Sequence, residues 1–317
     1  MYIGVDLGGT KIKIGMVDEE GQIVSSGLID TDPSHDDKVI MKDMTVEIER
    51  LIKQEGMQLQ DIKSIGIGVP GLVDYQKGSI IYCTNLSWYN VEAVNYLKEH
   101  FKIPVYIEND ATVAAYAESL FGSTKEAKDS VFLTIGTGIG GGIIINKQII
   151  RGAHGAGSEI GHTVIGENFY DCNCGRNGCF ETLASATAMI KYALHKMNTN
   201  AEVSSLQRAY IEKGQLEAKD IFDHAAMGDA LSIETVDRTA KYLAIGIANI
   251  YNILDPEIIA IGGGVSKAGD SFFDLVRSKV KKMTLVDSDN IKYGEIVRAE
   301  LGNDAGIIGA AFLSKQA

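Results

Sequence analysis

Three of the chain's four cysteines lie within eight residues, at Cys172, Cys174 and Cys179, and His162 stands ten residues before the first of them. Cys172 and Cys174 are separated by a single residue, which is a poor geometry for a mutual disulfide. Three thiolates and an imidazole instead supply the four donors of a closed tetrahedral Zn²⁺ site. Because no ligand position stays open, we expect this zinc to be structural rather than Lewis-acidic.

Two carboxylates flank the predicted zinc site: Glu159 precedes His162 by three residues, and Glu181 follows Cys179 by two. With one ring nitrogen of His162 on the metal, the other carries a proton and can donate to a hydroxyl. Carboxylates that accept and an imidazole that donates would form a cradle for a polyol. From the residues alone, two solvated loop glutamates remain an equal alternative.

Two glycine-rich turns, "DLGGTK" (residues 6–11) and "GTGIGGG" (residues 136–142), could bind phosphates. The second contains G-x-G-x-x-G, but a β-branched run follows it where a dinucleotide fold needs a helix. Neither a Walker loop nor the H-R-D and D-F-G motifs of protein kinases occur. Each turn offers backbone N–H groups and a Thr hydroxyl without a blocking side chain. The candidate nucleotide contacts are Asp6, which could also hold Mg²⁺, with Gly8, Gly9, Thr10, Lys11, Thr137 and Gly138. Glycines that merely tighten two turns are the alternative.

Asp110 ends the segment "END" and stands directly before the Ala-rich stretch "ATVAAYAESLF", which we expect to be helical. Position alone favours an N-cap role for Asp110, because aspartate is a preferred capping residue. A role as general base is compatible with that position, since a helix N-terminus helps to keep a carboxylate ionised.

The elements that carry these residues follow a plan that occurs twice. The strand–turn–strand pattern of residues 2–24 returns at residues 131–150, and each copy leads to a helix and then to a strand ending in glycines. In addition, "IENDATVAAYA" (residues 107–117) resembles "LGNDAGIIGAA" (residues 301–311). Three similarities in the same order predict two related α/β halves that face one another across a cleft.

Composition narrows the classes of partner. The chain has 317 residues and a net charge of −12, which argues against nucleic-acid and anionic-membrane partners. We see no secretory signal, and the longest near-apolar run, "YLAIGIANIYNIL", is too short to span a bilayer. We therefore expect a cytoplasmic, reducing location, which also weighs against disulfides.

These motifs together resemble the ROK family of repressors, open-reading-frame proteins and sugar kinases. The resemblance rests on "DLGGT", "END", "GTGIGGG", "EIGH", "CNCGRNGCFE" and "IGGGVS" and runs from Gly4 to the C-terminal "LGNDAGIIGAAF". The spacing G-H-x₉-C-x-C-G-x-x-G-C-x-E is the family's signature. Within the family, the cysteine segment and the C-terminal segment are most similar to the glucokinases of Gram-positive bacteria.

The resemblance implies an actin-like, hexokinase-type fold, in which two ribonuclease H-like α/β domains are duplicated around an interdomain cleft. The expected small domain comprises residues 1–112 and 302–317, and the expected large domain, with the zinc module, comprises residues 113–301. A homodimer is also implied.

The resemblance further implies transfer of the γ-phosphoryl group of MgATP to the 6-hydroxyl of glucose. Asp110 would be the catalytic base, and Gly263 and Gly264 would lie near the nucleoside. The residues implied to hold the sugar are Asn109, Asp110, Glu159, His162 and Glu181, and those implied to bind zinc are His162, Cys172, Cys174 and Cys179.

Three alternatives stay open at this point. A kinase of the same family could act on fructose, mannose or an N-acetylhexosamine. A transcriptional repressor would need a helix-turn-helix domain, for which we expect no room before the first strand at Tyr2. A non-catalytic sugar sensor would have no need of a base at Asp110.

Overall fold

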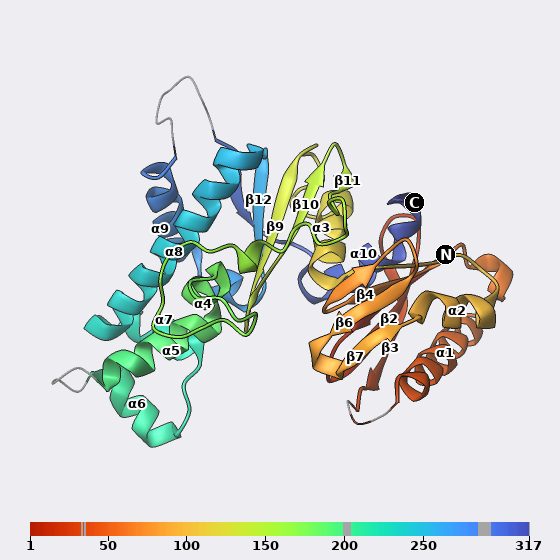
Figure 1. Ribbon diagram of the computed structural model, residues 1–317, viewed down its shortest axis with the longest axis horizontal. Helices are drawn as coiled ribbons and strands as arrows, with labels where there is room; N and C mark the ends of the chain where they lie inside the picture. Colours follow the sequence, from red (N-terminus) through yellow and green to blue (C-terminus); the bar gives the residue numbers. More distant parts are fainter. Residues whose placement is uncertain (33, 35, 199–203, 285–292, 317) are drawn as a thin grey trace. The chain divides into compact units, whose positions relative to one another are not determined.

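The computed structural model describes residues 1–32, 34, 36–198, 204–284 and 293–316 and divides into two compact units (Figure 1). Unit 1 consists of Met1–Phe132, Gly142–Ser158 and Ala299–Ala317, and unit 2 consists of Leu133–Gly141 and Glu159–Arg298. Among the described helices, none is both long and apolar enough to cross a membrane.

The first five-stranded sheet starts with the hairpin predicted around "DLGGTK". Its order is β3-β2-β1-β4-β8, formed by β1 (Tyr2–Leu7), β2 (Lys11–Val17), β3 (Ile23–Asp30), β4 (Ile65–Val69) and β8 (Val105–Asn109). β1 runs antiparallel to β2 and parallel to β4, and β4 runs parallel to β8. The register aligns Asp6 with Gly68 and Gly68 with Glu108. The polar residues at the ends of β1 and β8 therefore lie at the same end of the sheet, where these parallel strands reach their carboxyl termini.

Helix α10 (Ala305–Ala311) lies directly on one face of this sheet, because glycine leaves room for its backbone. A Cβ added at Gly4 would stand 1.9 Å from the Ile307 carbonyl oxygen, and one at Gly66 would stand 1.8 Å from that of Ala310. Successive strand residues point to opposite faces, so Ile3 packs on the other side. There it joins the core that α1 (Asp37–Gln54) and α2 (Ala93–Phe101) complete.

The second five-stranded sheet has the order β11-β10-β9-β12-β13. Its strands are β9 (Ser130–Ile135), β10 (Ile139–Ile145), β11 (Gln148–Ile149), β12 (Ile258–Gly262) and β13 (Glu295–Arg298). When the strands of each sheet are numbered along the chain, both sheets read 3-2-1-4-5. This common order agrees with the duplicated α/β plan predicted from the sequence.

The remaining elements complete each unit. In unit 1, a small antiparallel sheet contains β5 (Leu72–Asp74), β6 (Ser79–Cys83) and β7 (Trp88–Val91), and α3 (Asp110–Phe121) packs against α10. The helices of unit 2 are α4 (Phe180–Ala184), α5 (Ala186–Met197), α6 (Ser205–Lys213), α7 (Ala218–Ala226), α8 (Ala230–Leu254) and α9 (Asp270–Lys281).

The bounds of these units differ from the domain boundaries expected from the sequence. Residues 113–132 and 142–158 belong to unit 1, although we expected them in the large domain. The reason is close packing of α3: a Cβ at Gly309 of α10 would lie 1.8 Å from the Val113 carbonyl oxygen, and one at Gly142 would lie 2.3 Å from the Ala115 Cβ. The expected two-domain division itself stays a prediction.

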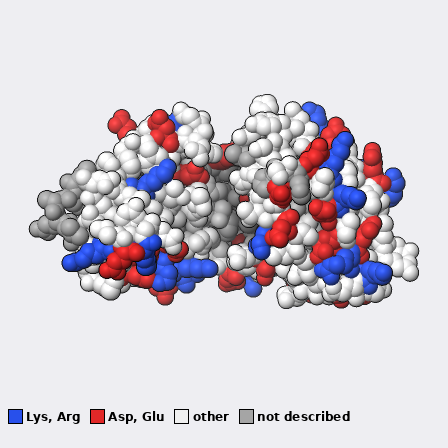
Figure 2. Space-filling model, turned by 90° about the horizontal axis from the view of Figure 1, so that it is seen from below, with Lys and Arg blue, Asp and Glu red and all other residues white. Residues whose placement is uncertain are grey.

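Charged side chains are mixed in sign over the surface that Figure 2 displays, where red and blue groups are interspersed. The densest basic run of the sequence, at residues 277–282, lies at the end of α9, where Arg277 and Lys281 are exposed. Arg277 pairs with Asp274 at 2.9 Å, one turn earlier in the same helix. This run is therefore part of a solvated helix face.

Candidate functional site

The junction between β8 and α3 carries Asn109 and Asp110. Asn109 is the N-cap, and its Oδ1 accepts the backbone N–H of Thr112 at 3.1 Å. Its Nδ2 donates to the Gly71 carbonyl oxygen at 3.2 Å. Asp110 is the first helical residue, and its Oδ1 accepts the N–H of Ala111 at 2.8 Å. Capping is therefore the role of Asn109, and the interpretation of Asp110 as the cap is wrong.

Asp6 lies near the end of β1, at the same sheet edge as this junction. Its side chain is 27% exposed and lies 3.7 Å from the Lys13 ammonium. Burial raises the pKa of Asp6 above its usual value because it disfavours the charged form, while Lys13 acts in the opposite direction. A partly buried carboxylate of this kind is a candidate ligand for Mg²⁺.

The first glycine turn is narrow. The Gly8 N–H donates to the Lys11 carbonyl oxygen at 3.0 Å, and a Cβ at Gly8 would stand 2.4 Å from that oxygen. A Cβ at Gly9 would lie 2.7 Å from the Cβ of Asn85. Thr10 and Lys11 are exposed. The turn therefore needs its glycines for its own geometry, whatever it binds.

The second glycine turn is tied to a carboxylate. The Ile139 N–H donates to Glu181 Oε2 at 3.1 Å, and a Cβ at Gly138 would stand only 2.0 Å from the same oxygen. Thr137 is exposed at the tip of the turn. The absence of a side chain at Gly138 thus makes room for Glu181, a purpose that the sequence did not reveal.

Gly263 and Gly264 follow the last residue of β12. Gly263 has φ +79°, and a Cβ there would lie 2.5 Å from the Ile135 carbonyl oxygen. A Cβ added at Gly264 would have no atom of the described residues within 4 Å. The backbone at Gly264 is accordingly accessible to a ligand.

The four predicted zinc ligands come together in unit 2. One donor atom from each of His162, Cys172, Cys174 and Cys179 lies within 4.8 Å of all the others. Cys172 Sγ is 3.7 Å from His162 Nδ1, and Cys174 Sγ is 3.5 Å from Cys179 Sγ. Tetrahedral ligands with Zn–S distances of about 2.3 Å stand about 3.8 Å apart, so the spacing fits this ion.

The thiols of the cluster differ in acidity. Hydrogen bonds from the backbone and side chain of Arg176 lower the pKa of the exposed Cys174 to about 6. Burial and the neighbouring thiols raise the pKa of Cys179 to about 12. A bound divalent cation would deprotonate a coordinating thiol outright. Cys83 lies buried outside the cluster, as expected of an ordinary thiol.

Of the residues expected to bind the sugar, some lie at the cysteine cluster and others do not. His162 directs Nδ1 at Cys172, which leaves Nε2 as the nitrogen able to donate to a ligand. Glu181 Oε1 is 3.9 Å from Cys172 Sγ, so its carboxylate bridges the cysteine cluster and the glycine turn. Glu159 is exposed and is the N-cap of the short 3₁₀ helix Ile160–His162. Asn109 and Asp110 belong to unit 1, so the structure does not place them relative to these three.

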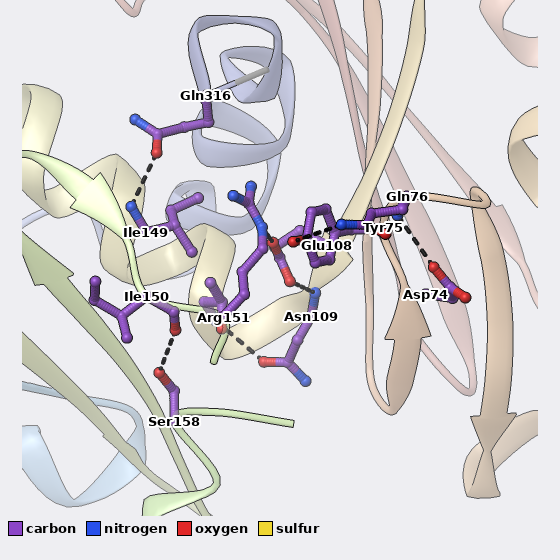
Figure 3. A network of polar contacts seen from close by, with 11 residues as sticks. Asp74, Tyr75, Gln76, Glu108, Asn109, Ile149, Ile150, Arg151, Ser158 and Gln316 are labelled. Atoms are coloured by element: carbon purple, nitrogen blue, oxygen red, sulfur yellow. Dashed lines mark hydrogen bonds and ion pairs between the residues drawn. The ribbon is translucent and has the colours of Figure 1, made fainter. Parts of the chain in front are cut away.

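Sequence reasoning missed Arg151, whose guanidinium Nε lies 2.5 Å from Glu108 Oε2 (Figure 3). In the sequence, Glu108 is marked only as the first residue of "END". The two residues are 43 positions apart, and no motif joins them. An isolated arginine before a glycine-rich loop carries no signal of this pairing.

Comparisons with known proteins agree over the whole chain. The model of the ROK family matches residues 2–317. A glucokinase of Halalkalibacterium halodurans is 39% identical over 317 residues, which cover 99% of this chain and 95% of the relative. A solved ROK family glucokinase from Streptomyces griseus, in complex with glucose and AMPPNP, is 31% identical, with a TM-score of 0.80 and coverage of 100% of this chain and 99% of that one.

The similarity extends to regulators. The xylose repressor of Bacillus subtilis is 30% identical over 308 residues, which cover 97% of this chain but 75% of the repressor. This chain is thus also similar to a repressor, over three quarters of that protein's length.

Proposed function

This chain belongs to the ROK family and is an ATP-dependent sugar kinase, and we propose that its substrate is glucose, phosphorylated at the 6-hydroxyl. The observation that carries the choice of glucose is the 39% identity to a glucokinase along 99% of this chain. Kinase chemistry adds one requirement that a binding protein lacks, which is a base beside the accepting hydroxyl.

Asp110 is the proposed base. It would accept the proton of the sugar hydroxyl as the γ-phosphoryl group is transferred, a contribution of about 10²–10⁴ in rate. Because Asn109 provides the helix cap, the carboxylate of Asp110 is not required for that role. Asp110 lies in the first turn of α3, where the helix dipole interacts favourably with a negative charge.

The proposed sugar contacts divide by chemistry. Carboxylate oxygens of Glu159 and Glu181 would accept hydrogen bonds from sugar hydroxyls, and the Nε2 proton of His162 would be donated to one of them. Asn109 can both donate and accept through its amide. Zinc on the Cys₃His set would hold His162 close to the start of α4, which carries Glu181, without an open ligand position.

The proposed ATP contacts are backbone groups of the two turns and of Gly263 and Gly264. Phosphoryl transfer depends chiefly on positioning and on neutralisation of charge. Asp6 is the proposed carboxylate for Mg²⁺, and it lies at the same end of the sheet as Asn109, the last residue of β8. The contacts assigned to phosphate are those of Gly8, Gly9, Thr10, Lys11, Thr137 and Gly138. A cytoplasmic homodimer completes the proposal.

The test is ADP release with MgATP and a panel of glucose, fructose, mannose, xylose and two N-acetylhexosamines. We expect the highest kcat/KM for glucose. A higher value for another hexose would move the substrate assignment to that sugar and leave the reaction unchanged.

A sugar-responsive regulator is the second candidate, because of the 30% identity to a xylose repressor. It predicts sugar binding without turnover. Absence of ADP release with every sugar, in protein shown to contain zinc and to bind one of them by calorimetry, would favour this candidate over the kinase.

A further inference from the structure

Glu108, two residues before the proposed base, forms a largely buried ion pair with Arg151. The Glu108 side chain is 6% exposed and that of Arg151 is 17% exposed, with 2.5 Å between Nε and Oε2. Burying two charges costs free energy that their attraction alone often fails to recover. Apolar residues would pack here without that cost, so the pair needs an explanation other than stability.

Glu108 acts on the residue that follows it. Its Oε1 accepts the backbone N–H of Asn109 at 3.0 Å, while Oε2 receives Arg151 (Figure 3). β8 is an edge strand, so an N–H that points away from β4 has no partner in the ladder. The carboxylate supplies that partner at the last residue before Asp110.

Arg151 is itself held from several directions. Its guanidinium carbon lies 4.6 Å from the centre of the Tyr75 ring, which fixes the plane of the group. The strand before it is anchored because the Ile149 N–H donates to Gln316 Oε1 at 2.9 Å. The loop after it closes on itself, since the Gly157 N–H donates to the Arg151 carbonyl oxygen at 2.9 Å.

The same loop continues into another part of the proposed site. Ser158 Oγ donates to the Ile150 carbonyl oxygen at 3.1 Å, and Ser158 has φ +69°. The next residue in the chain is Glu159, a proposed sugar contact. Arg151 therefore stands at the base of a closed loop that leads directly to Glu159, and its partner Glu108 holds the backbone that leads to Asp110.

We propose that the Arg151–Glu108 pair fixes the β8–α3 junction for phosphoryl transfer, so that both act on the reaction through Asn109 and Asp110 as positioning residues. The inference rests on the proposed kinase function. Loss of the guanidinium leaves a buried carboxylate without its counter-charge, and Glu108 then turns away from the Asn109 N–H. Small displacements of a reacting group cost rate rather than substrate affinity alone.

The experiment compares Arg151→Gln, Glu108→Gln and the double variant with wild type, in kcat, in KM for sugar and ATP, and in melting temperature. We expect Arg151→Gln to lower kcat about 10–100-fold with little change in KM for ATP. The double variant should recover part of that loss, because no unpaired carboxylate remains and two amides can still bond each other.

Lys279→Gln is the matched control. Lys279 is 21% exposed and pairs with Asp237 at 2.7 Å, and neither residue is a proposed site residue. We expect its kcat to stay within about twofold of wild type. Should Arg151→Gln not fold, Arg151→Lys, which keeps the charge but not the planar fork, replaces it.

Two outcomes would overturn the inference. In the first, Arg151→Gln has the same kcat as the Lys279→Gln control. In the second, the single and double variants lose kcat equally, and the loss parallels the fall in their melting temperatures. Failure of the proposed function is a separate result, because then the wild type itself turns over no sugar.

Discussion

At the scale of single residues, Asp110 can be removed without removing the cap of α3. We predict that Asp110→Ala lowers kcat by about 10²–10⁴ while circular dichroism and the melting temperature stay close to wild type, because Asn109 still caps the helix. Asp304→Ala is the control, since Asp304 corresponds to Asp110 in the sequence repeat and is the N-cap of α10 without a side-chain capping hydrogen bond. An Asp110→Ala enzyme with near-normal kcat would remove the assignment of the base.

The cysteine cluster gives a second prediction at this scale. We expect elemental analysis to find about one zinc per chain, and Cys179→Ser to lose it together with glucose binding. Cys83→Ala is the control, because Cys83 is a buried thiol outside the cluster. Calorimetry with glucose, before and after chelation, measures the effect. Full glucose affinity in metal-free protein would contradict a zinc-supported sugar site.

At the scale of elements, the second glycine turn and α4 are joined through Glu181. We predict that Gly138→Ala raises the KM for glucose about 10–100-fold, because the added Cβ would stand 2.0 Å from Glu181 Oε2 and displace that carboxylate. In the same turn, Gly136→Ala is the control, since a Cβ there has open space to 4 Å among the described residues. Equal glucose KM values for the two variants would separate Gly138 from the sugar site.

The N-cap of α8, Asp229, predicts how the stability of the protein depends on pH. Asp229 accepts the N–H and hydroxyl of Ser232, each at 2.9 Å. Burial opposes ionisation, but these bonds and those from Ser205 prevail and lower the pKa of Asp229. Its contribution is therefore complete above the unfolded pKa of about 3.9 and is lost as pH falls through the lower folded value.

Accordingly, Asp229→Ala should lower the free energy of unfolding by about 1–2 kcal/mol at pH 7. The difference from wild type should shrink as pH falls below about 4. Urea unfolding of both proteins between pH 7 and pH 3 measures it. A difference that is constant across this range would mean that the carboxylate charge is not what stabilises the helix.

The sequence predicted those elements that are determined by residues close together in the chain. Both glycine hairpins appear because alternation and turn residues mark them within some 20 positions, and the cysteine spacing marks the cluster in the same way. It did not predict that residues 113–132 join unit 1, because that depends on packing between α3 and α10, which is nearly 200 residues away in the chain. The pairing of Arg151 with Glu108 was missed for the same reason.

At the scale of the whole molecule, the proposed sugar contacts come from both units: Asn109 and Asp110 belong to unit 1, and Glu159, His162 and Glu181 belong to unit 2. A ligand that binds only the native state stabilises it by about 2.7 kcal/mol at 100 times its Kd. If Asn109 in unit 1 and Glu181 in unit 2 both hold glucose, that stabilisation must reach both units.

We therefore predict that saturating glucose slows hydrogen exchange in peptides that cover residues 105–121 and in those that cover residues 159–184. Mass spectrometry of the exchanged peptides measures each segment separately, and mannitol at equal concentration controls for solvent effects. Protection confined to residues 159–184 would leave Asn109 and Asp110 outside the sugar site and so contradict the base assignment independently of kinetics. Stronger protection by xylose than by glucose would instead align the chain with the repressors that it also resembles.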